Sequence, residues 1–259
     1  MKKSKWPLNQ PPMLWTWDFL KFPAVLTLAH SPHDWIRNYP ISTWNRTTKK
    51  KLISLRSHWR IRDQRKSFYI LGSTSYGEAQ ASFDYYSTIA QHYNPLLEKE
   101  FSFLFRKLED FLRIKFNQHV YYDPELSLPG FHIIGDTTSV NVPHVDAQYL
   151  FHPAYTGLSK LDDSKVFTFT VAISIPSRCG IRFWSDFRFL GYHEQGPQDF
   201  LRFAGVHAPQ ELEYEEGKIY FHKGHLLHQL LPAKEKGSSY RMTLQGHGIF
   251  TDQGILAYF

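Results

Sequence analysis

Apolar and polar residues follow two different periods along the chain. Between residues 95 and 116, apolar residues recur at spacings of three and four, which is the period of a helix with one buried face. These residues are Leu97, Phe101, Leu104, Leu108 and Phe111. Asn94 is expected to cap this helix and Pro95 to occupy its first turn. We therefore predict a helix near 95–116 that packs against a sheet.

From about residue 118 onward, the pattern changes to short β-prone runs separated by Gly, Pro and Asp. The predicted strands span residues 119–122, 131–134, 147–151, 166–174, 181–184, 218–222, 226–231 and 240–250. About eight short strands with turn residues between them favour a closed or double-sheet antiparallel architecture. The predicted fold is mainly β with flanking helices, and residues 118–250 form its double-stranded β-helix core, of the jelly-roll or cupin-like type.

The rest of the chain is expected to support that core. Residues 1–117 are predicted to be irregular and helical, with one strand-like segment at 67–71. The stretch 73–77 is predicted to be a loop, and the connections 151–163 and 191–209 are long enough to cover a site. The chain, 1–259, is expected to form a single domain.

Composition agrees with a large folded core. Hydrophobic residues make up 42% of the chain and aromatic residues 17%, which suits a β core and an apolar pocket. The formal charge of +6 comes largely from residues 2–5, 46–51 and 56–66, and the basic stretch could face an acidic substrate or partner. No zinc-finger or RNA-recognition motif is present, so no nucleic-acid partner is expected.

Cysteine usage and hydropathy bear on the compartment. Cys179 is the single cysteine, so no internal disulfide forms, which suits a reducing cytosol. We find no signal peptide and no apolar run long enough to cross a membrane. A cytoplasmic protein with no membrane partner is therefore expected, and the oligomeric state stays open.

The pair His144 and Asp146 is the first candidate for chemistry. One residue separates them, so in an extended segment both side chains face one ion. Three later histidines could supply the third ligand. His228 is preferred because it is predicted to lie on the second strand of the segment 218–231, His225 is the reserve, and His222 is expected to be a structural or pocket residue. Two imidazoles and one carboxylate leave coordination positions open, as non-haem ferrous iron requires. A single cysteine argues against a thiolate zinc site.

Arg241 and Thr243 form the second candidate group, because they share a face if their segment is extended. A guanidinium offers a planar, permanently charged fork to a carboxylate. A metal and this arginine together suit an oxo-acid with two carboxylates. Gln148, or Tyr149 if the chain bends, is expected to hydrogen-bond that acid or the metal ligands.

The ordered set His144-x-Asp146, His228 and Arg241-x-Thr243 resembles the 2-oxoglutarate/iron(II) dioxygenases, which have a double-stranded β-helix core. The resemblance covers the predicted β core. It implies that the first three residues bind Fe(II), and that Arg241 and Thr243 bind the distal carboxylate of 2-oxoglutarate. O2 is the further co-substrate, and no catalytic residue is implied beyond the metal centre. Halogenating members lack the carboxylate ligand, so Asp146 implies oxidation without halide.

The function implied by this resemblance is that of a hydroxylase. It would oxidise an unactivated C–H bond of an amino acid or other small, natural-product-like substrate, with release of succinate and CO2. Three alternatives stay open: a peptide or protein side-chain hydroxylase of the same family, a cupin-type metalloenzyme that does not use 2-oxoglutarate, and a binding module with structural histidines.

Five further polar residues are candidates for the site, each with an equally open structural role. His247 is expected to border the pocket, and His132 to lie near the co-substrate. Ser139 and Asn141 precede the ligand pair and would orient it or form a turn. Arg182 would contact an acidic substrate or form a surface ion pair.

Overall fold

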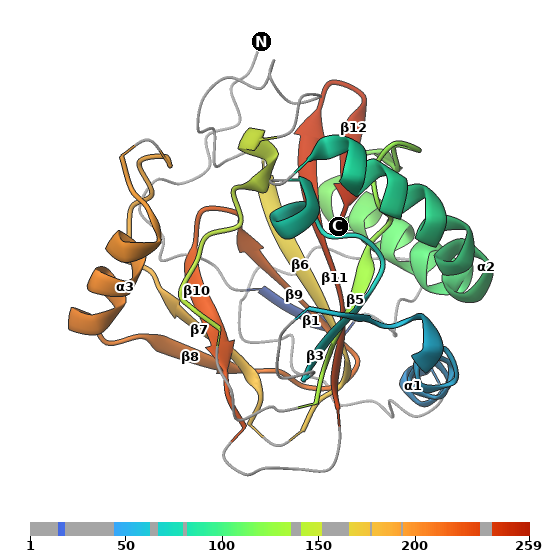
Figure 1. Cartoon of the computed structure of the whole chain (residues 1–259), viewed down its shortest axis with the longest axis horizontal. Coiled ribbons are helices and arrows are strands. Elements are labelled where there is room, and N and C mark those ends of the chain that lie inside the picture. The colour runs from blue at the N-terminus through green and yellow to red at the C-terminus, as the bar shows by residue number, and fades with distance from the viewer. Residues whose placement is uncertain are drawn as a thin grey trace.

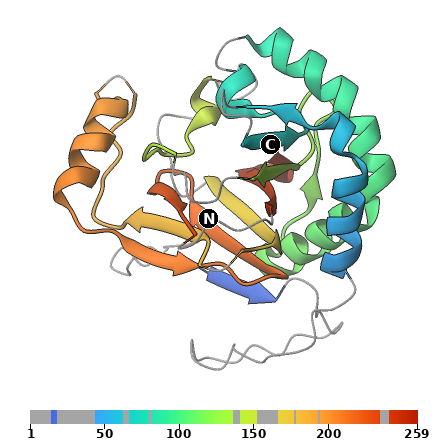
Figure 2. The ribbon, with the colours of Figure 1, turned by 60° about the horizontal axis from the view of Figure 1, so that its bottom comes forward.

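The computed structural model describes residues 15–18, 44–62, 67–79, 82–135, 141–151, 166–176, 178–192, 194–233 and 240–259. Its strands form two sheets that face each other, with helices outside them (Figure 1). Figure 2 shows helices α1 (Trp44–Ser54) and α2 (Phe83–Phe116) on the outer side of the larger sheet, and α3 (Pro197–Val206) beside the smaller one. In the part of the chain described, no helix is long and apolar enough to cross a membrane.

The larger sheet has the strand order β1-β9-β6-β11-β5-β3-β2. Its strands are β1 (Trp15–Asp18), β2 (Arg60–Ile61), β3 (Phe68–Leu71), β5 (Gly130–Ile134), β6 (Val166–Ser174), β9 (Lys218–Lys223) and β11 (Arg241–Thr251). β12 (Gly254–Tyr258) pairs antiparallel with β11 and parallel with β4 (Val120–Tyr121). Three strands from the first third of the chain thus extend this sheet at its edges.

The smaller sheet has the order β10-β7-β8. Its strands are β7 (Gly180–Trp184), β8 (Gln210–Glu213) and β10 (Leu227–Leu231). His144 adds an antiparallel bridge to His228 on β10. From β5 to β11 the chain passes repeatedly between the two sheets: β5 and β6 lie in the larger sheet, β7 and β8 in the smaller one, and β9, β10 and β11 alternate between them. This is the strand arrangement of a jelly roll, so the predicted fold class is confirmed.

β6 separates an apolar face from a polar one. Phe167, Phe169 and Val171 point outward into the main hydrophobic core, while Thr168 and Thr170 point inward between the sheets. Successive side chains of a strand face opposite sides, so one segment can supply both the core and the wall of a cavity.

α2 covers the outer apolar face of the larger sheet. Its predicted stripe of apolar residues is buried. The rings of Phe101 and Phe131 on β5 have centroids 4.5 Å apart, and those of Phe111 and Phe221 on β9 are stacked at 5.6 Å. The stripe therefore anchors the helix to the sheet, as the sequence pattern predicts.

The predicted start of this helix is wrong. Helix α2 begins at Phe83, after Ser82, whose hydroxyl accepts a hydrogen bond from a backbone N–H of the first turn. Asn94 is not a cap, and its side chain binds the backbone of the loop before β5. Pro95 lies inside the helix, and the backbone leaves helical geometry at Phe101, with φ −130° and ψ 15°. Pro95 resembles a first-turn proline in the sequence, but a long helix can tolerate a proline in its interior when the helix is kinked.

One predicted strand, 147–151, is also wrong. Residues Gln148–Phe151 form a 3-10 turn, η3. A short apolar run has too few residues to distinguish a strand from a helical turn. β8 and β12 were not predicted, and the charged Gln-Glu-Leu-Glu sequence of β8 lacks the apolar alternation of a typical strand.

Two of the three predicted loops contain helical structure. Residues 73–77 lie in part in a π-helical turn, η2 (Ser75–Ala79). The connection 191–209 contains α3. Of the connection 151–163, all but the first residue lies outside the described residues.

Glu78 lies buried in η2 and ties this turn to the edge of the larger sheet. Its Oε1 accepts hydrogen bonds from Arg60 Nη2 at 2.6 Å and Arg62 Nη1 at 2.9 Å. Its Oε2 accepts from the backbone N–H of Thr74 at 2.5 Å and from the hydroxyls of Thr74 and Ser73. Burial alone would raise the pKa of Glu78, but the Thr74 N–H and the two guanidinium groups outweigh it and lower that pKa.

We predict that Glu78→Gln lowers the free energy of unfolding by about 3 kcal/mol at neutral pH, because two guanidinium groups lose a buried partner. The folded-state pKa of Glu78 lies below its unfolded value. Its contribution is therefore complete above about pH 4.3 and is lost as the pH falls through the folded-state pKa. Urea unfolding should show that the difference in unfolding free energy between wild type and variant becomes smaller in acid.

Glu100→Gln is the matched control. Glu100 Oε2 lies 3.0 Å from Lys51 Nζ in a more exposed ion pair, which should contribute less than about 1 kcal/mol. Two results would contradict the role of Glu78. One is an equal loss of unfolding free energy in the two variants, and the other is a loss in Glu78→Gln that does not change in acid.

Candidate metal centre

A cavity of about 800 Å³ lies between the two sheets. Thr168 and Thr170 of β6 line it, together with Arg241, Gln245 and His247 of β11. Met242 and Leu244 of β11 point into the main core instead. The alternation predicted for this strand therefore brings its polar face to the cavity.

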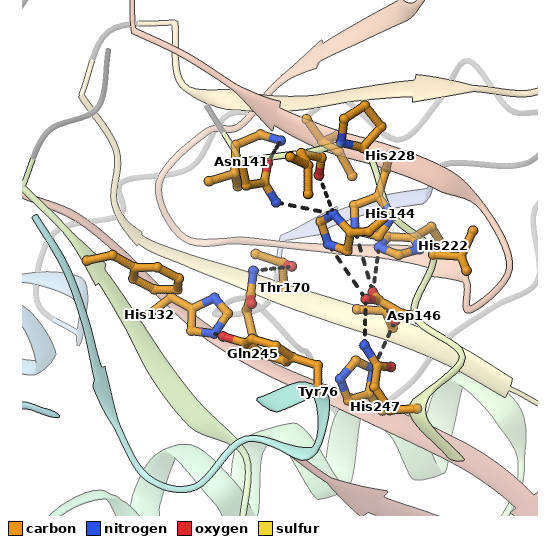
Figure 3. Close-up of a pocket in the computed structure, with 18 of the residues that line it drawn as sticks. Tyr76, His132, Asn141, His144, Asp146, Thr170, His222, His228, Gln245 and His247 are labelled. Atoms are coloured by element: carbon orange, nitrogen blue, oxygen red, sulfur yellow. Dashed lines mark hydrogen bonds and ion pairs between the residues drawn. The ribbon is translucent and has the colours of Figure 1, made fainter. Parts of the chain in front are cut away.

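His144, Asp146 and His228 lie together in this cavity (Figure 3). One potential ligand atom of each lies within 4.8 Å of the others. His144 Nε2 is 3.9 Å from Asp146 Oδ1, and His228 Nε2 is 3.6 Å from Asp146 Oδ2. The three side chains form a group that can hold a metal ion.

Backbone pairing fixes the relative positions of these side chains. The N–H of His144 donates to the carbonyl of His228, and the N–H of His228 donates to the carbonyl of His144, both at 2.9 Å. The N–H of Asp146 donates to the carbonyl of Gly224 at 2.7 Å. A Cβ at Gly224 would lie 2.7 Å from the Asp146 carbonyl oxygen, so only glycine permits this close approach.

Hydrogen bonds also fix which ring nitrogen faces the centre. His144 Nδ1 is 2.9 Å from the carbonyl oxygen of Val142, and His228 Nδ1 is 2.9 Å from that of Leu226. A carbonyl oxygen only accepts, so Nδ1 carries the proton and the Nε2 lone pair faces Asp146. Burial lowers the pKa of His228 to about 3, which keeps the ring neutral, as metal binding requires.

The Asp146 carboxylate is held by a hydroxyl and surrounded by imidazoles. Thr168 Oγ1 donates to Asp146 Oδ2 at 2.8 Å and lies 3.1 Å from His247 Nδ1. Thr168 has one proton and gives it to the carboxylate, so His247 Nδ1 must donate to Thr168. Burial alone would raise the pKa of Asp146, but attraction to the four surrounding histidines in their protonated form, His228 foremost, lowers that pKa well below its usual range.

Arg241 is buried, and none of the described carboxylates lies against its guanidinium. Its Nη1 donates to the carbonyl of Gly180 at 3.1 Å, and its guanidinium carbon is 5.2 Å from the centre of the Tyr214 ring. Burial lowers the pKa of Arg241, yet a guanidinium stays charged in proteins. Within the described ranges, no carboxylate forms an ion pair with it. A buried charge without a counter-ion is unfavourable, so this position favours binding of an anion.

Unsatisfied polar atoms mark the same region. In the described part of the chain, five buried side-chain polar atoms lack a hydrogen-bond partner, and three of them are Gln148 Oε1, Arg241 Nε and Thr243 Oγ1. These are the three residues predicted to bind the co-substrate. Buried polar groups are nearly always paired, so Arg241 Nε and Thr243 Oγ1 favour binding of a hydrogen-bond acceptor, and Gln148 Oε1 favours a donor. Gln148 lies beside the metal ligands, since its Nε2 is 3.4 Å from Asp146 Oδ1.

His222 and His225, the two other histidines near His228 in the sequence, lie in different places. His225 Nε2 is 2.9 Å from the Tyr149 hydroxyl, and its ring contacts Phe189 in an aromatic cluster. The reserve candidate His225 is therefore not part of the triad. His222 lines the cavity, and its Nε2 is 3.7 Å from Asp146 Oδ2.

A tyrosine–histidine pair also lines the cavity. The Tyr76 hydroxyl is 3.0 Å from His132 Nε2. Burial lowers the pKa of His132 to about 3 and raises the pKa of Tyr76. The phenol of Tyr76 therefore donates to a neutral imidazole.

The remaining candidates lie as follows. Asn141 Oδ1 accepts from a backbone N–H of β10 at 2.8 Å, which ties the ligand segment to that strand. Asn141 Nδ2 lies 3.2 Å from His144 Nδ1, but it cannot donate to that nitrogen, which carries a proton. Ser139 lies outside the described residues. Arg182 forms an ion pair of 2.7 Å with a β8 carboxylate, which is the structural role considered for it.

Sequence reasoning missed Tyr76 and Thr168. The inward direction of Thr168 could have been predicted, because side chains alternate along a strand and its neighbours on the predicted strand 166–174 are apolar core residues. Its contact with His247 depends on the pairing of β6 with β11, in which these two residues are opposite each other, and no local pattern shows that register. Tyr76 faces the cavity from a π-helical turn, for which the sequence offers no periodic signal.

No protein-family model and no curated protein sequence matches the chain. Three solved structures illustrate what it is similar to. An N-substituted L-amino acid dioxygenase from Burkholderia ambifaria is 15% identical with a TM-score of 0.44, covering 74% of this chain and 86% of that one. The non-heme alpha ketoglutarate dependent carbocyclase SnoK from nogalamycin biosynthesis is 14% identical with a TM-score of 0.43, and the match covers 84% of this chain and 76% of that one. The epimerase SnoN, in complex with Fe3+, alpha ketoglutarate and nogalamycin RO, is 12% identical with a TM-score of 0.43, and the match covers 79% of this chain and 76% of that one.

We predict that Thr168→Val weakens metal binding about 10- to 100-fold, because the Asp146 carboxylate loses the hydroxyl that orients it. Thr168→Ser keeps the hydroxyl and should recover most of the affinity. Competition with a chromophoric chelator for Co²⁺ measures both.

Thr170→Val is the control. Thr170 lies on the same face of β6, but its hydroxyl contacts the Gln245 amide, at 3.4 Å, and the Tyr214 side chain rather than Asp146. Its metal affinity should equal that of wild type. Equal losses in the Thr168 and Thr170 valine variants would mean that the effect is not specific to Asp146.

Proposed function

We propose that this chain is a 2-oxoglutarate- and Fe(II)-dependent oxygenase. In this proposal His144, Asp146 and His228 bind the iron, and Arg241 and Thr243 bind the distal carboxylate of 2-oxoglutarate. One observation carries the proposal. A three-residue nitrogen and oxygen ligand group shares a cavity with a buried guanidinium that lacks a counter-ion in the described structure.

The donor set suits ferrous iron. Two neutral imidazoles and one carboxylate supply three ligands and leave positions for exogenous ligands. A structural zinc site would need a closed set of four, usually with thiolates, and the single cysteine, Cys179, is not part of the group.

The other polar groups suit an oxo-acid with two carboxylates. The oxo-acid end would bind the metal beside Gln148, whose Oε1 lacks a partner. The distal carboxylate would accept hydrogen bonds from the guanidinium of Arg241 and the hydroxyl of Thr243, whose unpaired atoms are both donors. Such binding would neutralise the buried charge and satisfy Arg241 and Thr243 at once, while Gln148 Oε1, which only accepts, would take a hydrogen bond from a donor such as water.

When bound, iron, 2-oxoglutarate and dioxygen together supply the oxidation of a C–H bond, with release of succinate and CO2. The chain itself orients the substrate and excludes water. Tyr192 and Phe200 line the cavity from the segment that carries α3. The Tyr192 hydroxyl donates to the carbonyl of Val145 at 3.4 Å, so this aromatic wall is attached to the ligand segment.

The proposed reaction is hydroxylation of an amino acid or another small, natural-product-like molecule. The cavity volume of about 800 Å³ lies within the range of small-molecule sites. Both aromatic and polar side chains line the cavity and would accommodate a substrate with both kinds of surface. A substrate screen for succinate release above the uncoupled rate would identify it, and activity confined to peptides would favour the side-chain hydroxylase instead.

One observation favours a second candidate, a cupin-type metalloenzyme that does not use 2-oxoglutarate. His222 places a third imidazole beside Asp146. A fourth protein ligand would reduce the positions open to a chelating oxo-acid and dioxygen.

We expect anaerobic addition of Fe²⁺ and 2-oxoglutarate to give a weak visible charge-transfer band. Arg241→Gln should retain the band but require about 10- to 100-fold more 2-oxoglutarate, the effect of losing a charge-assisted hydrogen bond. Titration of the band measures both. Its absence from metal-loaded wild type would contradict the proposal.

Asp146→Ala combined with His228→Ala should abolish the band, because the metal loses two of its three ligands. His225→Ala is the matched control and should leave the band unchanged. Persistence in the double variant would show that other residues bind the metal, and normal 2-oxoglutarate affinity in Arg241→Gln would favour the cupin-type enzyme.

A further inference from the structure

His222 is a third imidazole at the candidate metal centre, and it has no assigned role. It lies on β9 and is 6% exposed. Its Nε2 is 3.7 Å from Asp146 Oδ2, and its ring centroid is 4.5 Å from that of His228 (Figure 3). This places it on the cavity side of the carboxylate, beside one of the candidate ligands.

The tautomer of His222 follows from its backbone contact. Its Nδ1 is 2.8 Å from the carbonyl oxygen of Lys223. That oxygen can only accept, so Nδ1 carries a proton, and in the neutral form of the ring Nε2 presents a lone pair. His144 and His228 are held in the same way, each through Nδ1 and a nearby carbonyl. Three Nε2 lone pairs therefore face one carboxylate.

His222 nevertheless lies outside the ligand group. The atoms of His144, Asp146 and His228 are mutually within 4.8 Å, and His222 is not part of that set. Asp146 Oδ2 already accepts the Thr168 proton. Among the described residues, none donates a hydrogen bond to His222 Nε2. Two buried acceptors that face each other are unfavourable unless a donor lies next to them.

We propose that His222 Nε2 accepts a hydrogen bond from a water molecule that completes the coordination of the bound metal beside Asp146. The inference rests on the metal centre of the proposed function, but not on 2-oxoglutarate. A substrate hydroxyl has the same donor chemistry, and a test with metal alone separates these two sources. His222 is thus a positioning residue that strengthens metal binding through the water.

The decisive measurement is the long-range ¹H–¹⁵N spectrum of histidine rings in the Zn²⁺-loaded protein without 2-oxoglutarate. Zn²⁺ stands in for Fe²⁺ because it is diamagnetic. His144 and His228 should show metal-bound Nε2, and His222 should show a protonated Nδ1 with an unprotonated, metal-free Nε2. A metal-bound Nε2 at His222, or a proton on it, would overturn the proposal.

Affinity provides the second readout. His222→Phe should weaken Co²⁺ binding roughly tenfold, and His222→Gln, which keeps an acceptor oxygen, should recover part of that loss. His225→Phe is the control and should bind Co²⁺ as wild type does. Wild-type affinity in His222→Phe would overturn the proposal, while a protein that binds metal as predicted but not 2-oxoglutarate would contradict only the proposed function.

Discussion

The alternation of side chains along β6 and β11 is the constraint on which the rest of the structure depends. One face of these central strands carries Phe, Val, Met and Leu side chains into the core under α2. The opposite face carries Thr168 and Thr170, together with Arg241 and His247, into the cavity. Because the side-chain period is two, a register shift of one residue would bury the polar row against α2 and expose the apolar row. Packing of the outer face therefore fixes the geometry of the inner face.

On that inner face, two unfavourable features are kept. A carboxylate is buried among neutral imidazoles, and a guanidinium is buried without a counter-ion in the described structure. Each would destabilise an isolated fold. Bound metal would neutralise the first and a bound carboxylate the second. Glu78 shows the contrast, because its buried charge is fully paired within the protein. Unpaired charge thus distinguishes the candidate site from structural ion pairs.

Much of this arrangement could be predicted from sequence because it depends on local period. The bounds of the 166–174 strand, the inward face of Arg241 and the closeness of His144 to Asp146 all follow from alternation. The failures have physical causes. Pro95 inside a kinked helix resembles a first-turn proline, and the residues after Asp146 form a single 3-10 turn. The contact of Thr168 with His247 depends on strand pairing between distant segments, which no local pattern encodes.

The central claim is that one cavity binds a metal and, through Arg241, the far carboxylate of an oxo-acid. The most direct test compares the anaerobic affinity of the Co²⁺-loaded protein for 2-oxoglutarate and for 2-oxopentanoate, which has the same chain length but lacks the distal carboxylate. The account predicts that wild type prefers 2-oxoglutarate by about 10- to 100-fold, and that Arg241→Gln loses this preference. Equal affinity for the two acids in wild type, or a preference that survives in Arg241→Gln, would contradict it.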